Sequence, residues 1–258
     1  MTPTLKEMEI LARKAGAILL EGYGKKHQID FKSEIDPVTE TDRKSEEFLV
    51  SEIKLRYPDD RIVAEESGES QGINQRSWYI DPLDGTVNFS HDIPIFSVSI
   101  AFANHLGIQL GVVYDPIRDE CFSAEYKKGA FLNDTPIHVS QIKSLNQSLL
   151  VTGFPYDIRS NHRNNLNYHN AFMLCSQGVR RLGSAALDLS YVAAGRFDGF
   201  WELSLEAWDV AAGILIAHEA GALVTDVDGG DKYFLPPYPI LAASPVIHAQ
   251  MLEVIRKA

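Results

Sequence analysis

The chain has 258 residues, of which 45% are hydrophobic, and its formal net charge at pH 7 is -11. A chain of this length and composition can bury a sizeable core, as one large domain or as two fused halves. The acid excess argues against a nucleic-acid-binding protein, which needs a basic face, and against attraction to an anionic membrane. We therefore expect neither nucleic acid nor a membrane as a partner.

The cysteines and the N-terminus indicate the compartment. Cys121 and Cys175 lie far apart in apolar surroundings and fit neither a disulfide framework nor a zinc-binding spacing. We expect both to be buried free thiols in a reducing compartment. The first residues lack the apolar core of a signal peptide, and no apolar run is long enough to span a membrane. A cytoplasmic protein is the resulting prediction.

Helices dominate the pattern of the first 60 residues. Apolar residues at helical spacing predict helices at 4–24 and 42–57, with a strand-like segment at 29–32 and a polar turn between them. The second helix begins with Thr41 or Asp42 as its N-cap. Capping by itself accounts for Asp42, but the same carboxylate could also face a functional site.

Two acids follow the first apolar strand. Residues 61–64 predict a short buried strand, and Glu65 and Glu66 come directly after it. Layered α/β proteins build sites at such strand ends. An exposed acid pair in a loop is the simpler interpretation and is preferred for Glu66, whereas Glu65, nearest the strand, is a candidate ligand. The polar residues 68–77 have no periodicity and predict a loop.

The central motif places two carboxylates around a proline after an apolar run. Its sequence is Trp78-Tyr79-Ile80-Asp81-Pro82-Leu83-Asp84-Gly85-Thr86-Val87-Asn88-Phe89. The pattern predicts a strand that ends at Asp81, a turn fixed by the proline and a short helix that opens near Thr86. A surface turn is the simpler interpretation, but the apolar residues on both sides favour a buried site.

This turn offers ligands for both a cation and an anion. Asp81 and Asp84 can face one pocket with the Leu83 carbonyl between them, and three oxygen ligands suit a hard divalent cation, Mg²⁺ above all. The backbone N–H groups of Gly85 and Thr86, at a helix N-terminus, suit a bound phosphate.

The remaining chain changes from antiparallel strands to alternating strands and helices. Alternation predicts antiparallel strands at 97–102, 108–114 and 120–125, and the non-periodic residues 133–147 separate the two halves. Predicted strands then lie at 149–152, 179–182, 197–201, 222–225 and 240–243, and predicted helices at 161–176, after Ser184, at 208–216 and at 245–257. Asp209 opens an apolar helix as an N-cap or first-turn acid, which is compatible with metal binding.

Three motifs in this order resemble those of the inositol monophosphatase family, within the lithium-sensitive, magnesium-dependent phosphatase superfamily. They are residues 63–67, residues 78–89, and Glu202 followed by residues 208–213. The resemblance covers the whole chain, and the segment from 181 to 199 is similar to the bacterial branch in particular.

The resemblance implies a fold and an assembly. The fold is an α+β, layered α-β-α-β-α sandwich, with an antiparallel-rich half at 1–140 and an α/β half at 141–258 within a single catalytic unit, residues 1–258. A homodimer is also implied.

A set of metal ligands is implied as well. Glu65, Asp81 and the Leu83 carbonyl would hold a first Mg²⁺. Asp81, Asp84 and Asp209 would hold a second, with Asp81 bridging, and a weaker third ion would lie near Glu65. Two to three ions are therefore expected.

The resemblance implies the remaining site residues. Thr86 with Asp42 would orient or deprotonate the attacking water, so the catalytic residues would be Glu65, Thr86 and Asp42. The substrate would be bound by Asp84, Gly85, Thr86, Gly183, Ser184, Ala185, Glu202 and Asp209. Lys32 would lie at the edge of the pocket.

The implied reaction is Mg²⁺-dependent hydrolysis of a small phosphorylated polyol or sugar, with inositol 1-phosphate as the leading substrate. No serine, cysteine or histidine nucleophile motif is evident, which favours direct attack by a water activated by the metal ions. Fructose 1,6-bisphosphate, histidinol phosphate and 3′-phosphoadenosine 5′-phosphate are alternative substrates. A non-catalytic regulatory protein on the same fold is an alternative of another class. Residues 153–159 differ from the animal inositol phosphatases, on the alcohol side of the substrate.

Overall fold

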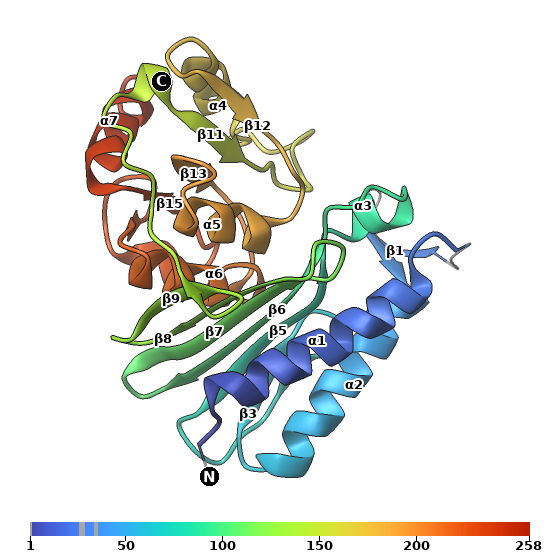
Figure 1. The fold of residues 1–258 in the computed structure, drawn as a ribbon. Helices are drawn as coiled ribbons and strands as arrows, with labels where there is room; N and C mark the ends of the chain where they lie inside the picture. The colour runs from blue at the N-terminus through green and yellow to red at the C-terminus, as the bar shows by residue number, and fades with distance from the viewer. Residues whose placement is uncertain (1, 26–28, 34–35) are drawn as a thin grey trace.

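The chain folds into five alternating layers, α-β-α-β-α, across residues 2–25, 29–33 and 36–258, which the computed structural model describes (Figure 1). Helices α1 and α2 cover one face of the first sheet, α5 and α6 lie between the two sheets, and α4 and α7 cover the second sheet. The helices are α1 (Leu5–Gly22), α2 (Glu40–Arg56), α3 (Thr86–Ser90), α4 (Leu166–Met173), α5 (Ala185–Ala193), α6 (Ala207–Glu219) and α7 (Pro245–Ile255). This arrangement confirms the predicted fold.

The first sheet is antiparallel except at one pair of strands. Its order is β10-β9-β8-β7-β6-β5-β3-β4, and only β3 and β5 run parallel. The strands are β3 (Arg61–Ala64), β4 (Gly68–Ser70), β5 (Ser77–Asp84), β6 (Ser97–Asn104), β7 (Gly107–Asp115), β8 (Glu120–Glu125), β9 (Gly129–Leu132) and β10 (Thr135–Pro136). Ala64 pairs with Ile80, so the residues that follow them, Glu65 and Asp81, lie side by side.

The second sheet mixes parallel and antiparallel pairs. Its order is β12-β11-β13-β15-β14, in which the first three strands are parallel and the last two are antiparallel to their neighbours. The strands are β11 (Leu149–Thr152), β12 (Gly178–Arg180), β13 (Gly199–Glu202), β14 (Leu223–Thr225) and β15 (Ile240–Ala243). Outside both sheets, the shorter elements are β1 (Ile29–Ser33), β2 (Asp36–Thr39), η1 (Leu145–Gln147) and η2 (Lys232–Phe234).

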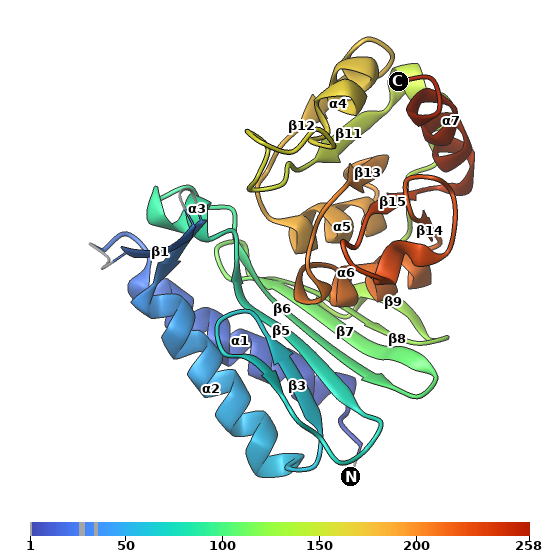
Figure 2. The same ribbon diagram turned by 180° about the vertical axis from the view of Figure 1, so that it is seen from behind.

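Apolar clusters join each layer to the next. Large aromatic residues such as Trp78 fill the space under α1 and α2, and Trp201 packs on Phe172 under α4 with ring centroids 4.3 Å apart. The central layer is different, because alanines of α5 and α6 supply much of its packing surface. Figure 2 shows these two helices between the sheets. Small side chains let the helix backbones approach both sheets closely.

The second helix begins earlier than the sequence predicted. Thr39, rather than Thr41 or Asp42, is the N-cap of α2, and its hydroxyl accepts from the backbone N–H groups of both. The Asp42 carboxylate accepts from the Thr39 N–H in return. The N-cap prediction is wrong because Thr39 and Asp42 form a reciprocal capping box, in which the acid is the third helical residue.

Three other boundaries differ from the predictions. Strand β5 continues past Asp81 to Asp84 through an irregularity in its pairing with β6, and residues 68–70 form the edge strand β4 instead of a loop. Helix α4 begins only after Asn165, which has a left-handed backbone conformation with φ of 71°.

Both cysteines are free thiols, but Cys175 is only half-buried. The predicted boundary near residue 140 falls between β10 and η1, and a single catalytic unit stays a prediction.

Substitution of Gly111 tests the close approach of α6 to β7. A Cβ on Gly111 would lie 2.8 Å from the Ala212 carbonyl oxygen, a backbone atom that cannot turn aside. We expect Gly111→Ala to lower the free energy of unfolding by about 1–3 kcal/mol, measured by urea denaturation. The control is Gly178→Ala on the edge strand β12, where the nearest atom ends the flexible Arg180 side chain. Equal stability of Gly111→Ala and the unmodified chain would contradict this packing.

Candidate active site

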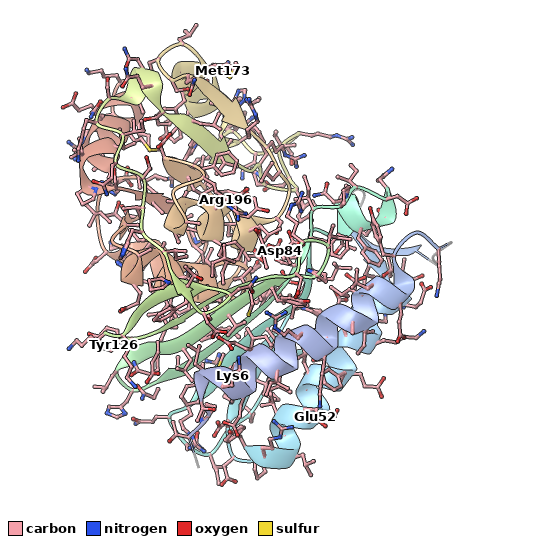
Figure 3. All side chains as sticks on the ribbon, viewed as in Figure 1. Lys6, Glu52, Asp84, Tyr126, Met173 and Arg196 are labelled. Atoms are coloured by element: carbon pink, nitrogen blue, oxygen red, sulfur yellow. The ribbon has the colours of Figure 1, made fainter. Side chains whose placement is uncertain are left out.

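A cavity of about 470 Å³ opens where the two halves meet. Residues at the ends of β3, β5 and β13 line it together with the N-terminal turns of α3, α5 and α6. Its walls include the predicted site residues Glu65, Asp81, Leu83, Asp84, Gly85, Thr86, Gly183, Ser184, Ala185, Glu202 and Asp209. Figure 3 shows Asp84 at this junction. The prediction for Lys32 concerns a side chain outside the described residues.

The pairing of β3 with β5 brings Glu65 and Asp81 together. The Glu65 N–H donates to the Ile80 carbonyl at 3.2 Å, which continues the parallel ladder by one residue. The turn after Glu65 is fixed by Glu46 of α2, whose carboxylate accepts from the N–H groups of Glu66 and Ser67 at 2.8 and 2.7 Å. Neither the pairing nor this support could be deduced from the spacing of the acids.

The segment after Asp81 stays in β5 as an irregular stretch up to Asp84, so the predicted end of the strand at Asp81 is wrong. Asp81 Oδ1 accepts from the Leu83 N–H at 2.9 Å, and Ser45 of α2 donates to the Pro82 carbonyl at 3.0 Å. Gly85 has φ of 107°, and a Cβ there would lie 3.0 Å from the Ile95 carbonyl oxygen. Only glycine fits this left-handed, crowded position. The short helix predicted near Thr86 is confirmed.

Asp42 both caps a helix and contacts the cavity wall. Its Oδ1 accepts from the Thr86 hydroxyl at 2.9 Å, while its Oδ2 accepts from the Thr39 N–H at 2.9 Å. The Thr86 hydroxyl also lies 3.1 Å from the Leu83 carbonyl oxygen, and its single proton can serve only one acceptor at a time. Complete burial raises the pKa of Asp42, against the effect of these hydrogen bonds.

Asp84 joins the two halves of the chain. Its Oδ2 accepts from the Ser184 hydroxyl at 2.7 Å and from the Ala186 N–H at 2.8 Å, both at the start of α5. Ser184 is the N-cap of that helix, as predicted. Burial raises the pKa of Asp84 to about 6, although the hydrogen bonds from Ser184 and Ala186 favour its charged form.

Asp209 lies in the first turn of α6 and lines the same cavity as the central motif. Its Oδ2 accepts from the N–H of Glu206, the N-cap residue, at 2.7 Å. Ser99 of β6 donates to the Trp208 carbonyl at 3.2 Å and so anchors this turn to the first sheet. Asp209 is therefore a first-turn acid, and the N-cap alternative is wrong.

The cavity acids raise one another's pKa. Burial holds the pKa of Asp81 well above its ordinary value, and the charges of Glu65, Asp84 and Asp209 raise it further. Burial and the charge of Asp84 do the same to Asp209. No ion pair formed by the described residues involves Asp81, Asp84 or Asp209. Such a group of oxygen donors fits a hard divalent cation, which would relieve the repulsion.

The side chains are not arranged as direct ligands of one ion. In the described part of the chain, no three Asp, Glu, His or Cys side chains form a group that could hold a metal ion. The oxygen donors that share the cavity are of the kind that a hard divalent cation takes.

Glu202 closes the far wall of the cavity. It is the last residue of β13 and packs against the backbone of Gly153, where any Cβ would overlap the Glu202 carboxylate. Burial raises the pKa of Glu202 to about 8, and the Asp84 charge adds to this effect while the Arg181 charge opposes it. The predicted alcohol side of the substrate therefore holds an acid that favours its protonated form at neutral pH.

Sequence reasoning missed three residues of this site. Asp188 and Arg181 line the cavity. The sequence signal for Asp188 is an acid within the otherwise apolar helix that follows Ser184. Asn88 also lines the cavity and donates from Nδ2 to the carbonyls of Ile95 and Leu182, at 2.8 and 2.7 Å. The bond to Leu182 holds α3 against the second half. Only the tertiary structure reveals that role.

A layered sandwich with carboxylates clustered at the junction of its halves fits the class of metal-dependent hydrolases. Residues 1–258 match the model of the inositol monophosphatase family, and the chain belongs to that family. It is thus a phosphoric monoester hydrolase of a magnesium-dependent, lithium-sensitive family. Among the described helices, none has the length and apolar character needed to cross a bilayer.

Known relatives resemble the chain over nearly its whole length. The chain is 44% identical to the Nus factor SuhB of Pasteurella multocida, covering 99% of this chain and 97% of that protein. It is 42% identical to the inositol-1-monophosphatase of Mesorhizobium japonicum, covering 98% and 96%. The crystal structure of extragenic suppressor protein suhB from Bartonella henselae matches with a TM-score of 0.91 at 41% identity, covering 97% of both chains. These matches confirm the family resemblance seen in the sequence.

The raised pKa values predict how stability depends on pH. The pKa of Glu202 is about 8 in the folded chain against an ordinary value of 4.5, so between these values the folded state binds more protons than the unfolded state. Raising the pH therefore favours unfolding. We expect the urea midpoint, measured in EDTA, to fall as pH rises from about 4.5 to about 8.

The matched control for this pH dependence is Glu202→Gln, which keeps the shape of the side chain and removes its titration. The fall above about pH 6, the pKa of Asp84, should become less steep in this variant. A midpoint of the unmodified chain that stays constant or rises over the whole range would contradict the raised pKa.

Proposed function

We propose that the chain hydrolyses the phosphate monoester of a small polyol, with inositol 1-phosphate as its leading substrate. The observation that carries the proposal is the cavity, which has acids suited to metal ions at one end and Glu202 at the other. The relative named inositol-1-monophosphatase, 42% identical over 98% of this chain, supports inositol as the alcohol.

The proposed metal ligands are those that the resemblance implies. Glu65, Asp81 and the Leu83 carbonyl would hold one Mg²⁺, Asp81, Asp84 and Asp209 a second, and a third would lie near Glu65. When bound, the ions would neutralise the charges of the phosphate and the leaving oxygen and lower the pKa of water. The convergence of these residues on one cavity supports this set.

Thr86 and Asp42 would orient the attacking water. When the Thr86 hydroxyl donates to Asp42 Oδ1, its lone pairs are free to accept a hydrogen bond from water in the cavity. The raised pKa of Asp42 favours its acceptance of a proton passed on by the hydroxyl. The backbone N–H groups of Gly85 and Thr86 would bind the phosphate, and Glu202 would orient the alcohol.

Phosphate release from a panel of esters tests the proposal. We expect turnover of inositol 1-phosphate with Mg²⁺, loss of turnover in EDTA and inhibition by Li⁺. Asp81→Asn should lower kcat/KM by more than about 100-fold, since replacing residues that only support metal ligands already costs 10- to 100-fold. Faster turnover of fructose 1,6-bisphosphate, histidinol phosphate or 3′-phosphoadenosine 5′-phosphate would refute inositol phosphate and retain the metal site.

A pair of substitutions at one position tests the role of the hydroxyl. Thr86→Ala should lower kcat by about 100-fold or more, because the attacking water loses its orienting group. Thr86→Ser keeps the hydroxyl and should stay within about tenfold of the unmodified chain. Both are measured by phosphate release at saturating Mg²⁺, with melting temperatures to exclude unfolding. Full activity of Thr86→Ala would rule out this assignment.

A regulatory role is a second candidate function. Its support is the name of the relative that is 44% identical to this chain, Nus factor SuhB. In a host strain that lacks the chain, restoration of growth by Asp81→Asn would favour regulation, and failure of this variant would favour catalysis.

Homodimer formation, cytoplasmic location and the absence of nucleic-acid binding stay predictions.

A further inference from the structure

Asp42, Ser45 and Glu46 are buried polar side chains on one face of α2. Their spacing of three and four residues places them side by side along the helix. Asp42 accepts from the Thr86 hydroxyl and Ser45 donates to the Pro82 carbonyl, so both bond to the central motif. The two bonds of Glu46 go instead to the chain that follows β3. One helix face thus contacts both strand ends that supply the predicted ligands of the first metal ion.

Glu65 is the first residue of a short loop at the edge of the first sheet. Residues 65–67 connect β3 to the edge strand β4, in which Ala64 pairs with Gly68. Strand β4 is only three residues long, and its first two residues are exposed. Such a strand gives the loop little support, because few buried contacts hold its far end. The position of Glu65 therefore depends on bonds from outside the hairpin.

Every backbone N–H group of this loop has an acceptor. The Glu65 N–H donates to the Ile80 carbonyl of β5 at 3.2 Å, and the N–H groups of Glu66 and Ser67 donate to the Glu46 carboxylate at 2.8 and 2.7 Å. Glu46 is only 4% exposed, so these two charge-assisted bonds are shielded from water. Two bonds to one carboxylate fix the orientation of the loop as well as its position.

A second cavity makes these bonds important for Glu65. It measures about 620 Å³ and is lined by α2 and by residues 65–67. Glu65 lines this cavity as well as the candidate active site, so it belongs to the boundary of both. Open space beside the loop supplies no packing contacts. The bonds to Glu46 are then what opposes a displacement of Glu65 away from Asp81.

We propose that Glu46 is a positioning residue that holds Glu65 where it can bind the first Mg²⁺. Glu46 would not touch the ion, and it would act through the backbone of the loop. Residues that orient a metal ligand typically change the metal affinity by about 10- to 100-fold when they are replaced. The inference rests on the proposed function, in which Glu65 is a metal ligand.

Glu46→Gln tests this role. The variant keeps the size of the side chain but replaces one accepting oxygen with an NH₂ group, so one N–H group of the loop loses its acceptor. We expect the Kd for Mg²⁺, measured by calorimetric titration without substrate, to rise by about 10-fold or more. The amide hydrogens of Glu66 and Ser67 should exchange faster with solvent, measured by nuclear magnetic resonance. At saturating Mg²⁺ kcat should largely recover, because the ligands themselves are intact.

Two further variants separate position from charge. Glu47→Gln removes the same charge from the next residue, which is exposed and lines the same second cavity as Glu65. It should change neither the Mg²⁺ affinity nor the exchange of the loop amides. Glu46→Asp keeps the charge but is one methylene shorter, so it should also weaken Mg²⁺ binding. It provides the same test if Glu46→Gln does not fold.

The outcomes distinguish this inference from the proposed function. Unchanged Mg²⁺ affinity in Glu46→Gln, or full affinity in Glu46→Asp, would overturn the positioning role alone. An equal loss of affinity in Glu46→Gln and Glu47→Gln would also overturn it, because charge would then explain both. If the unmodified chain binds no Mg²⁺, the proposed function and this inference fail together.

Discussion

Mutual repulsion among buried carboxylates is the constraint on which the rest of this structure depends. Asp81 and Asp84 are buried and Asp209 is partly buried in one cavity, where desolvation favours their protonated forms and like charges add to this effect for Asp81 and Asp209. A fold tolerates this only if other interactions hold the acids in position. The five-layer sandwich provides them, because each acid is fixed by an element that is itself packed into an apolar core.

Helix N-termini supply much of that stabilisation. Asp42 completes the capping box of α2, Asp84 accepts from the first turn of α5, and Asp209 bonds to the N-cap residue of α6. Backbone N–H groups at helix starts carry partial positive charge, so they stabilise carboxylates without a cationic side chain. The acids can therefore keep their positions with their charge still available to a metal ion. One set of residues begins the helices and builds the site.

The cavity exists only because the halves dock. Asp84 bonds to the start of α5, and Asn88 holds α3 against Leu182, so two residues of the central motif make contacts with the second half. Of the acids proposed as metal ligands, Glu65, Asp81 and Asp84 lie in the first half and Asp209 lies in the second. The second half also contributes Glu202 and Asp188 to the lining. Both halves therefore supply acids to one cavity.

The sequence by itself determined the fold class, the family and the central motif. These depend on local properties: apolar periodicity, the conformational limits of Pro82 and Gly85, and the order of three motifs. It could not determine that β3 pairs parallel with β5, that Thr39 caps α2, or that Asp188 lines the cavity. Those depend on contacts between residues far apart in the chain, which composition and spacing do not encode. Only tertiary packing brought Asp209 into the same cavity as Asp81.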